Sequence, residues 1–118
     1  MPGFCRDQLL QNNTKSNMNS HKILKIIKDN DFAEIPNHGK WIDAQSAIFV
    51  KEIRDYIFLL FVINKDPQKN SVRAMIAKFD CIESISLREP QQLMFYLTLQ
   101  KSEDLHYFEK YMNITQLH

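Results

Sequence analysis

The stretch YIFLLFVI, residues Tyr56–Ile63, decides the fold of this protein because its apolar side chains follow one another without interruption. A helix that spans a membrane needs about 20 apolar residues, whereas Arg54 and Asp55 precede this run and Lys65 and Asp66 follow it. The run is rich in β-branched and aromatic residues, which suit a pleated surface. We therefore predict a buried strand of about 26 Å, at roughly 3.3 Å per residue.

The segment before this run, AIFVKEI at residues 47–53, has a similar composition and predicts a second strand. Arg54 and Asp55 separate the two segments, which favours a β-hairpin over residues 44–64. One long helix from Asp43 is the alternative, because periodicity alone does not separate a short apolar strand from a buried helix. The residues at helical spacing are Phe49, Ile53, Tyr56, Ile57, Leu60 and Ile63.

Amphipathic helices are expected near both ends of the chain. The stretch HKILKIIKDN, residues 21–30, places Ile23, Leu24 and Ile27 on one face and lysines on the others. Near the other end, Ser102 is a suitable N-cap for a helix over residues 101–112. The apolar stripe of that helix consists of Leu105, Phe108, Tyr111 and Met112.

The region between these elements contains one clear strand and one ambiguous segment. QLMFYLTLQ, residues 92–100, alternates with a period of two, so that Leu93, Phe95, Leu97 and Leu99 are expected to face one way. The segment 71–87 fits either helix or strand, and we favour a helix over 71–80 and a strand over 82–87. Cys81, between Phe79 and Ile82, is expected to be a small buried core residue.

Together these elements predict an α+β fold with an antiparallel sheet of about 4–6 strands. The sheet should pack against an N-terminal and a C-terminal helix, with a possible third helix near 71–80. Residues 1–19 are polar and predict a flexible leader, and residues 20–118 predict a single globular domain. A central strand that is apolar on both faces needs a second cover. That cover is a curled sheet, a further helix or a second copy of the chain.

The charge balance argues against nucleic acid as a partner. Residues 1–19 hold Arg6, Lys15 and Asp7, so thirteen basic and thirteen acidic groups remain in residues 20–118. A duplex-binding domain carries a clear excess of Lys and Arg. The first twenty residues also lack the apolar stretch of a signal peptide, and the expected location is intracellular and cytoplasmic.

The sequence contains one candidate catalytic cluster, formed by Asp43, Glu52 and Arg54 near the ends of two predicted strands. It resembles the acidic arrangement with which some nucleases hold a metal against a phosphate. Arginine replaces the lysine of that arrangement, and arginine does not lose its proton to activate water. The chain has two glycines and two cysteines, which excludes glycine-rich phosphate loops and zinc-type cysteine pairs, so neither a metal nor a cofactor is expected.

Three residues are candidates for binding. Trp41 lies beside a predicted turn, and Lys65 and Lys69 are the lysines of the KDPQKN segment. A strand followed by a capped helix is similar to the end of a pleckstrin-homology domain, but two lysines are few for gripping a lipid head group, so lipid binding is not expected.

The order of elements also resembles that of small secretion chaperones, which are intracellular dimers of comparable size but usually acidic. The surplus of apolar residues and the lack of a catalytic cluster predict a non-enzymatic protein–protein interaction module, such as an adaptor, chaperone-like or inhibitor-like protein, that pairs with a protein partner or with itself. A pleckstrin-homology-like binding domain and a small metal-dependent nuclease are the alternatives.

Overall fold

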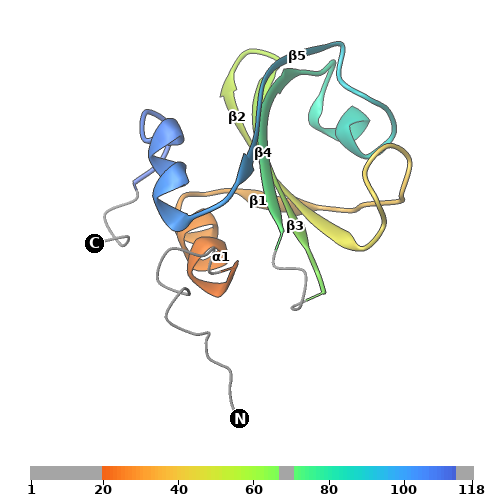
Figure 1. Cartoon of the computed structure of the whole chain (residues 1–118). Coiled ribbons are helices and arrows are strands. Elements are labelled where there is room, and N and C mark those ends of the chain that lie inside the picture. Colours follow the sequence, from red (N-terminus) through yellow and green to blue (C-terminus); the bar gives the residue numbers. More distant parts are fainter. Residues whose placement is uncertain (1–19, 67–70, 114–118) are drawn as a thin grey trace.

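One antiparallel sheet of five strands organises the protein, and its strand order β1-β2-β3-β4-β5 follows the chain (Figure 1). The computed structural model describes residues 20–66 and 71–113, so the predicted leader lies outside the described residues. The strands are β1 (Ala33–Ile35), β2 (Ser46–Arg54), β3 (Ile57–Asn64), β4 (Val72–Lys78) and β5 (Gln92–Leu99). An α-helix, α1 (Ser20–Asp29), and two 3-10 helices, η2 (Ile82–Ser86) and η3 (Ser102–Phe108), accompany them. The predicted α+β class with a sheet of 4–6 strands is confirmed.

The hairpin predicted over residues 44–64 is confirmed, and the long helix is not formed. β2 and β3 pair antiparallel, with Phe49 opposite Phe61. At the turn, Tyr56 adopts a left-handed backbone with φ of 66°. The Glu52 carboxylate accepts a hydrogen bond from the Tyr56 backbone N–H at 3.0 Å.

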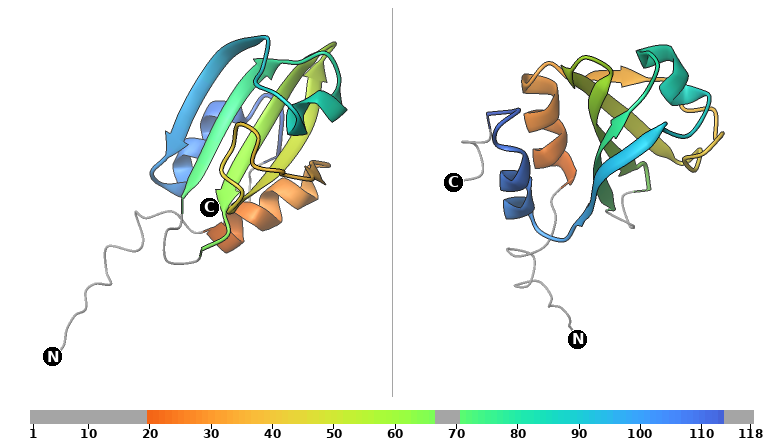
Figure 2. Two further views of the ribbon diagram at one scale, coloured as in Figure 1. Left: turned by 90° about the vertical axis from the view of Figure 1, so that its right-hand side faces the viewer. Right: turned by 90° about the horizontal axis from the view of Figure 1, so that it is seen from above.

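β3 is the central strand, and each of its faces packs against a different cover (Figure 2). Leu59, Phe61 and Ile63 belong to a core with α1 and η3, whereas residues between them belong to a second core on the opposite face. Alternate side chains of a strand point to opposite faces, so an unbroken apolar run supplies both cores at once.

The first core lies between the sheet and the pair α1 and η3, which lie side by side on one face (Figure 2). Ile23, Ile26 and Ile27 of α1 are fully buried there. Ile26 completes this buried face, and Leu24 lies at its edge, half-buried. The Phe61 ring meets the rings of Phe32 at 5.4 Å and Phe108 at 5.5 Å.

The second cover is made by the chain itself, from the loop of residues 36–45 and η2. The Trp41 indole Nε1 donates a hydrogen bond to the carbonyl of Ile85 at 2.7 Å. The Ser86 hydroxyl donates another to the carbonyl of Pro36, also at 2.7 Å. These bonds hold irregular backbone against the sheet, so a second copy is not needed to cover the central strand.

The helix favoured over residues 71–80 is wrong, because that segment forms β4. β4 lies between β3 and β5 and is buried on both faces, with Val72 and Ala74 in the first core and Met75 and Ala77 in the second. A strand covered on both faces shows no alternation of polar and apolar residues. Because this alternation is missing, the sequence of residues 71–80 also fits a helix.

The strand expected over residues 82–87 is also wrong, because Ile82–Ser86 forms the 3-10 helix η2. Cys81 precedes this helix and is exposed, contrary to the expected core position, since the chain turns away from the sheet after the buried Phe79. η3 begins at Ser102 with Lys101 as its N-cap residue. The Asp104 carboxylate accepts the backbone N–H of Lys101 at 3.2 Å, so this side chain, one turn into the helix, caps its start.

Candidate functional site

The proposed catalytic residue Asp43 is engaged in a structural contact at the start of β2. The Arg73 guanidinium of β4 lies 3.0 Å from one Asp43 carboxylate oxygen. The Ser46 hydroxyl donates a hydrogen bond to the other oxygen, also at 3.0 Å. Ser46 is fully buried, so Asp43 satisfies a hydroxyl that would otherwise lack a partner.

Glu52 and Arg54 lie near the other end of β2, at the β2–β3 turn, where Glu52 binds the Tyr56 backbone. Six residues separate Ser46 from Glu52, which corresponds to about 20 Å at roughly 3.3 Å per residue. The structure therefore does not bring the carboxylates of Asp43 and Glu52 together. Within residues 20–66 and 71–113, no group of three or more His, Cys, Asp or Glu side chains is placed to hold a metal ion.

The Asp43 contacts predict a dependence of stability on pH. Burial on its own would raise the pKa of this carboxyl, but the hydrogen bonds from Ser46 and Arg73 and the charge of Arg73 outweigh burial and hold the pKa below 3.8, its ordinary value. Because the pKa of Asp43 is lower in the folded protein, its ionised carboxylate stabilises the fold at pH values above 3.8. This stabilisation is lost as the pH falls through the folded-state pKa.

We expect Asp43→Asn to lower the free energy of unfolding at pH 7 by up to about 1 kcal/mol, the range of a partly exposed ion pair. The difference from wild type should shrink as the pH approaches 3, and urea unfolding across that range measures it. Asp55→Asn is the control, because Asp55 lies in the exposed β2–β3 turn, and it should leave the free energy of unfolding at pH 7 nearly unchanged. An Asp43→Asn deficit that grows toward pH 3 would contradict the assignment.

The candidate binding residues fall in separate places. Trp41 is half-buried, and its indole is committed to the bond with Ile85. Lys65 is exposed just after β3, and Lys69 lies outside the described residues. The predicted lysine pair therefore does not define a site, although Lys65 lines a hollow described below.

A further feature is β5, which lies at the edge of the sheet and, among the strands that the structure describes, pairs with β4 alone. A backbone hydrogen bond from Asn64 to Ser71 shows that odd-numbered residues of β4 bond toward β3. Bonding direction alternates along an antiparallel strand, so Val72, Ala74 and Ile76 of β4 bond toward β5, where their partners are Leu99, Leu97 and Phe95. The peptide groups of Tyr96 and Thr98 therefore point away from the sheet.

Large apolar side chains surround this free edge, and we call them the β5 surface. Tyr107 of η3 lies with them, since its ring is 6.5 Å from that of Phe95. Proteins usually protect an exposed edge with charged residues or proline, but β5 contains neither. The members and their exposed fractions are Leu93 53%, Met94 52%, Phe95 38%, Tyr96 47% and Tyr107 68%.

A register shift distributes the β5 surface over both faces of the sheet. Phe95 pairs with Ile76 and Leu93 pairs with Ala77, with the shift between these pairs. Ile76 packs on the first core and Ala77 belongs to the second. Directly opposite residues share a face, so Leu93 does not face the same way as Phe95, contrary to the predicted alternation.

A shallow hollow of about 310 Å³ adjoins the edge on the second face, and Trp41, Leu93 and Tyr96 are among its lining residues. The β5 surface is therefore continuous with this depression. The signal for this surface is visible in the sequence as QLMFYLTLQ, a stretch without charge. The sequence alone does not identify the β5 surface as exposed, because a strand with this pattern is equally suited to the interior of a sheet.

Comparison of the chain with known protein families, with curated proteins and with solved structures finds no match. In the part of the chain that the structure describes, no helix combines the length and the apolar character needed to cross a bilayer.

Proposed function

We propose that this protein is a non-enzymatic protein–protein interaction module that associates with a second copy of itself through the β5 surface. The observation that carries the proposal is an edge strand with outward peptide groups, exposed apolar side chains and no charge. An edge of this kind is a template for pairing with another strand.

A second copy suits this edge because the strand complements itself. Two copies of β5 run antiparallel about a two-fold axis, which is the commonest symmetry of soluble dimers. No like charges meet, since residues 92–99 are all uncharged. The formal net charge of the whole chain is +1, which produces little repulsion between copies.

The available area is also sufficient for a dimer. The five side chains of the β5 surface are 38% to 68% exposed, which amounts to roughly 500 Å² per copy at about 200 Å² for each large side chain. A stable interface buries about 800 Å² on each partner, of which part is polar rim. The outward peptide groups of Tyr96 and Thr98 add polar area to this apolar contribution.

The outward peptide groups are compatible with a symmetric register for this dimer. With Tyr96 opposite Tyr96 of the second copy, the outward groups of the two Tyr96 residues form a bonded pair at the axis. Two sheets joined in this way form one continuous sheet.

Light scattering on the full chain over a wide range of concentration tests the proposal, and we expect a reversible dimer. Tyr96→Lys places two lysines opposite each other at the axis and should raise the dimer dissociation constant at least about tenfold, because like charges directly opposite are destabilising. Tyr56→Lys is the matched control, since Tyr56 is a comparably exposed tyrosine at 56% but lies at the β2–β3 turn. It should leave the constant unchanged.

Thr98→Pro tests strand pairing separately from side-chain contact. Proline is tolerated where an edge N–H faces solvent, but it removes the donor that a pairing strand needs. We expect a folded monomer, as judged by circular dichroism and light scattering. A wild-type chain that stays monomeric at all concentrations overturns the proposal, and a dimer that survives both Tyr96→Lys and Thr98→Pro overturns its location.

A further inference from the structure

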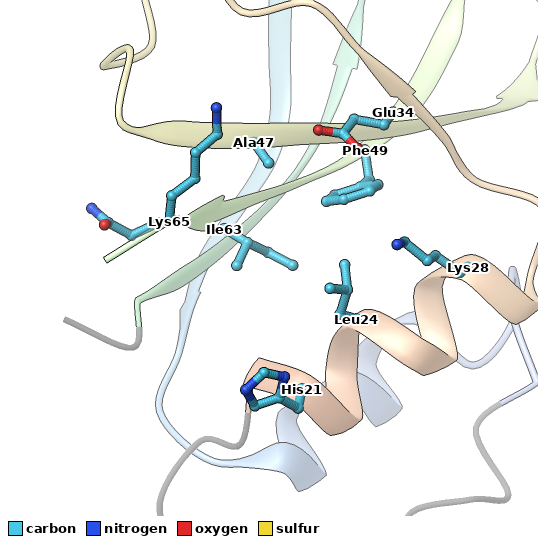
Figure 3. A pocket seen from close by; sticks show the side chains of 9 residues that line it. His21, Leu24, Lys28, Glu34, Ala47, Phe49, Ile63 and Lys65 are labelled. Carbon is cyan, nitrogen blue, oxygen red and sulfur yellow. The ribbon is translucent and has the colours of Figure 1, made fainter. Parts of the chain in front are cut away.

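A second hollow lies near the edge of the sheet opposite to β5, between α1 and the first residues of β2 (Figure 3). It has a volume of about 320 Å³, which is at the lower end of the range for small-molecule sites. β1 pairs with β2 only from Ile48 to Val50. The sheet edge beside Ala47 is therefore uncovered, and the hollow opens there.

The floor of this hollow is apolar. Phe49 and Ile63 supply it from the sheet, and both are nearly buried, at 3% and 7% exposure. Leu24 of α1 and Ala47 of β2 form the walls and are half-buried. In Figure 3 the Leu24 side chain points from α1 toward the gap between Ile63 and Phe49. A chain of methylene groups would find apolar contacts on several sides.

The rim carries an excess of positive charge. Lys28 and Lys65 line it from opposite sides, and Glu34 is the acidic residue among the lining side chains. Figure 3 shows the Lys28 ammonium directed into the mouth of the hollow above Leu24. Within residues 20–66 and 71–113, neither lysine side chain makes a hydrogen bond or an ion pair, in contrast to Lys25, whose ammonium lies 3.1 Å from Asp29.

We propose that this hollow binds a medium-chain fatty acid, with the alkyl chain on the floor and the carboxylate at Lys28. Charge complementarity selects an anionic head, since an ammonium and a carboxylate form a charge-assisted hydrogen bond. The volume of about 320 Å³ suits a small ligand. Octanoate, which combines a carboxylate with a short alkyl chain, is the probe for this class of ligand.

The proposal is independent of self-association, because the hollow is lined by residues of α1, β1, β2 and β3 and the residues that follow β3, whereas β5 forms the far edge of the sheet. Amide chemical-shift mapping of the full chain with octanoate, kept below its micelle concentration, tests it. We expect saturable shifts centred on Leu24, Ala47 and Ile63. Octanol, which has no charge, should bind the same residues more weakly.

Lys28→Gln should weaken octanoate binding about fivefold, which is about 1 kcal/mol, and leave octanol binding unchanged. Lys40→Gln is the control, since Lys40 is an exposed lysine that does not line the hollow. Ala47→Phe fills the hollow without changing charge and should abolish binding of both ligands while the remaining amide spectrum stays folded.

Three results would overturn the proposal: no saturable shifts, shifts centred on Leu93 and Tyr96 of the β5 surface, or octanoate affinity that is equal in wild type and in Lys28→Gln.

Discussion

Phe61→Ala is expected to lower the free energy of unfolding by about 3–5 kcal/mol, the range for removing a buried phenylalanine ring. Phe61 has no exposed surface and lies in the central strand. Its ring meets Phe32, which follows α1, and Phe108 of η3. The expected loss therefore includes the transfer free energy of the ring and the cost of the cavity that it leaves between β3, η3 and the residues that follow α1. Urea unfolding followed by circular dichroism measures it.

The control for this prediction is Leu87→Ala, because Leu87 is a large apolar side chain that is 53% exposed. Its effect should stay within about 0.5 kcal/mol. If Phe61→Ala does not fold, Phe61→Leu retains most of the volume and should give a smaller loss that still exceeds the control. A loss no larger than that of Leu87→Ala would contradict the position of Phe61 in the core.

Phe79→Ala is expected to cost about 3–5 kcal/mol as well, and to open the second cover. Phe79 is 1% exposed, and its ring centroid lies 6.0 Å from those of both Trp41 and Phe58. Trp41 is the only tryptophan in the chain, so its fluorescence reports on this cover alone. We expect a red shift of the native-state emission in Phe79→Ala.

The same measurement separates the two cores. Phe61→Ala changes the opposite face of the sheet, so it should leave the native emission of Trp41 unchanged. Phe79→Leu, which keeps most of the ring volume, should produce a smaller red shift than Phe79→Ala. Equal shifts in Phe61→Ala and Phe79→Ala would contradict the separation of the two covers by the sheet.

The hairpin of β2 and β3 was predictable because local composition decides it. β-Branched and aromatic residues fill both strands, and the charged pair Arg54 and Asp55 marks the turn. β4 was not predictable in the same way, because it is covered on both edges by β3 and β5 and on both faces by the two cores. A strand in such a position does not need a polar face, so its pattern also fits a helix.

The candidate sites show the same division. The sequence shows charged residues near strand ends, namely Asp43, Glu52 and Arg54. Because β2 is an extended strand, Asp43 lies near its start and the other two lie near its far end. Arg73, which holds Asp43, could not be proposed while its segment was interpreted as a helix. Lys65 was named as a binding candidate for its charge, and the structure adds the apolar hollow beside it.

What the sequence by itself determined is the antiparallel sheet, its central strand, predicted at Tyr56–Ile63 and found at Ile57–Asn64, and the need for a cover on each face. These follow from residue type and from the alternation of side chains along a strand. Only the tertiary structure decided that the loop of residues 36–45 and η2 supply the second cover, and that the uncharged strand β5 lies at the edge. The physical reason is that burial depends on which segments meet in space. The pattern within a strand reports that its side chains are apolar, and its place in the sheet decides whether they become core or surface.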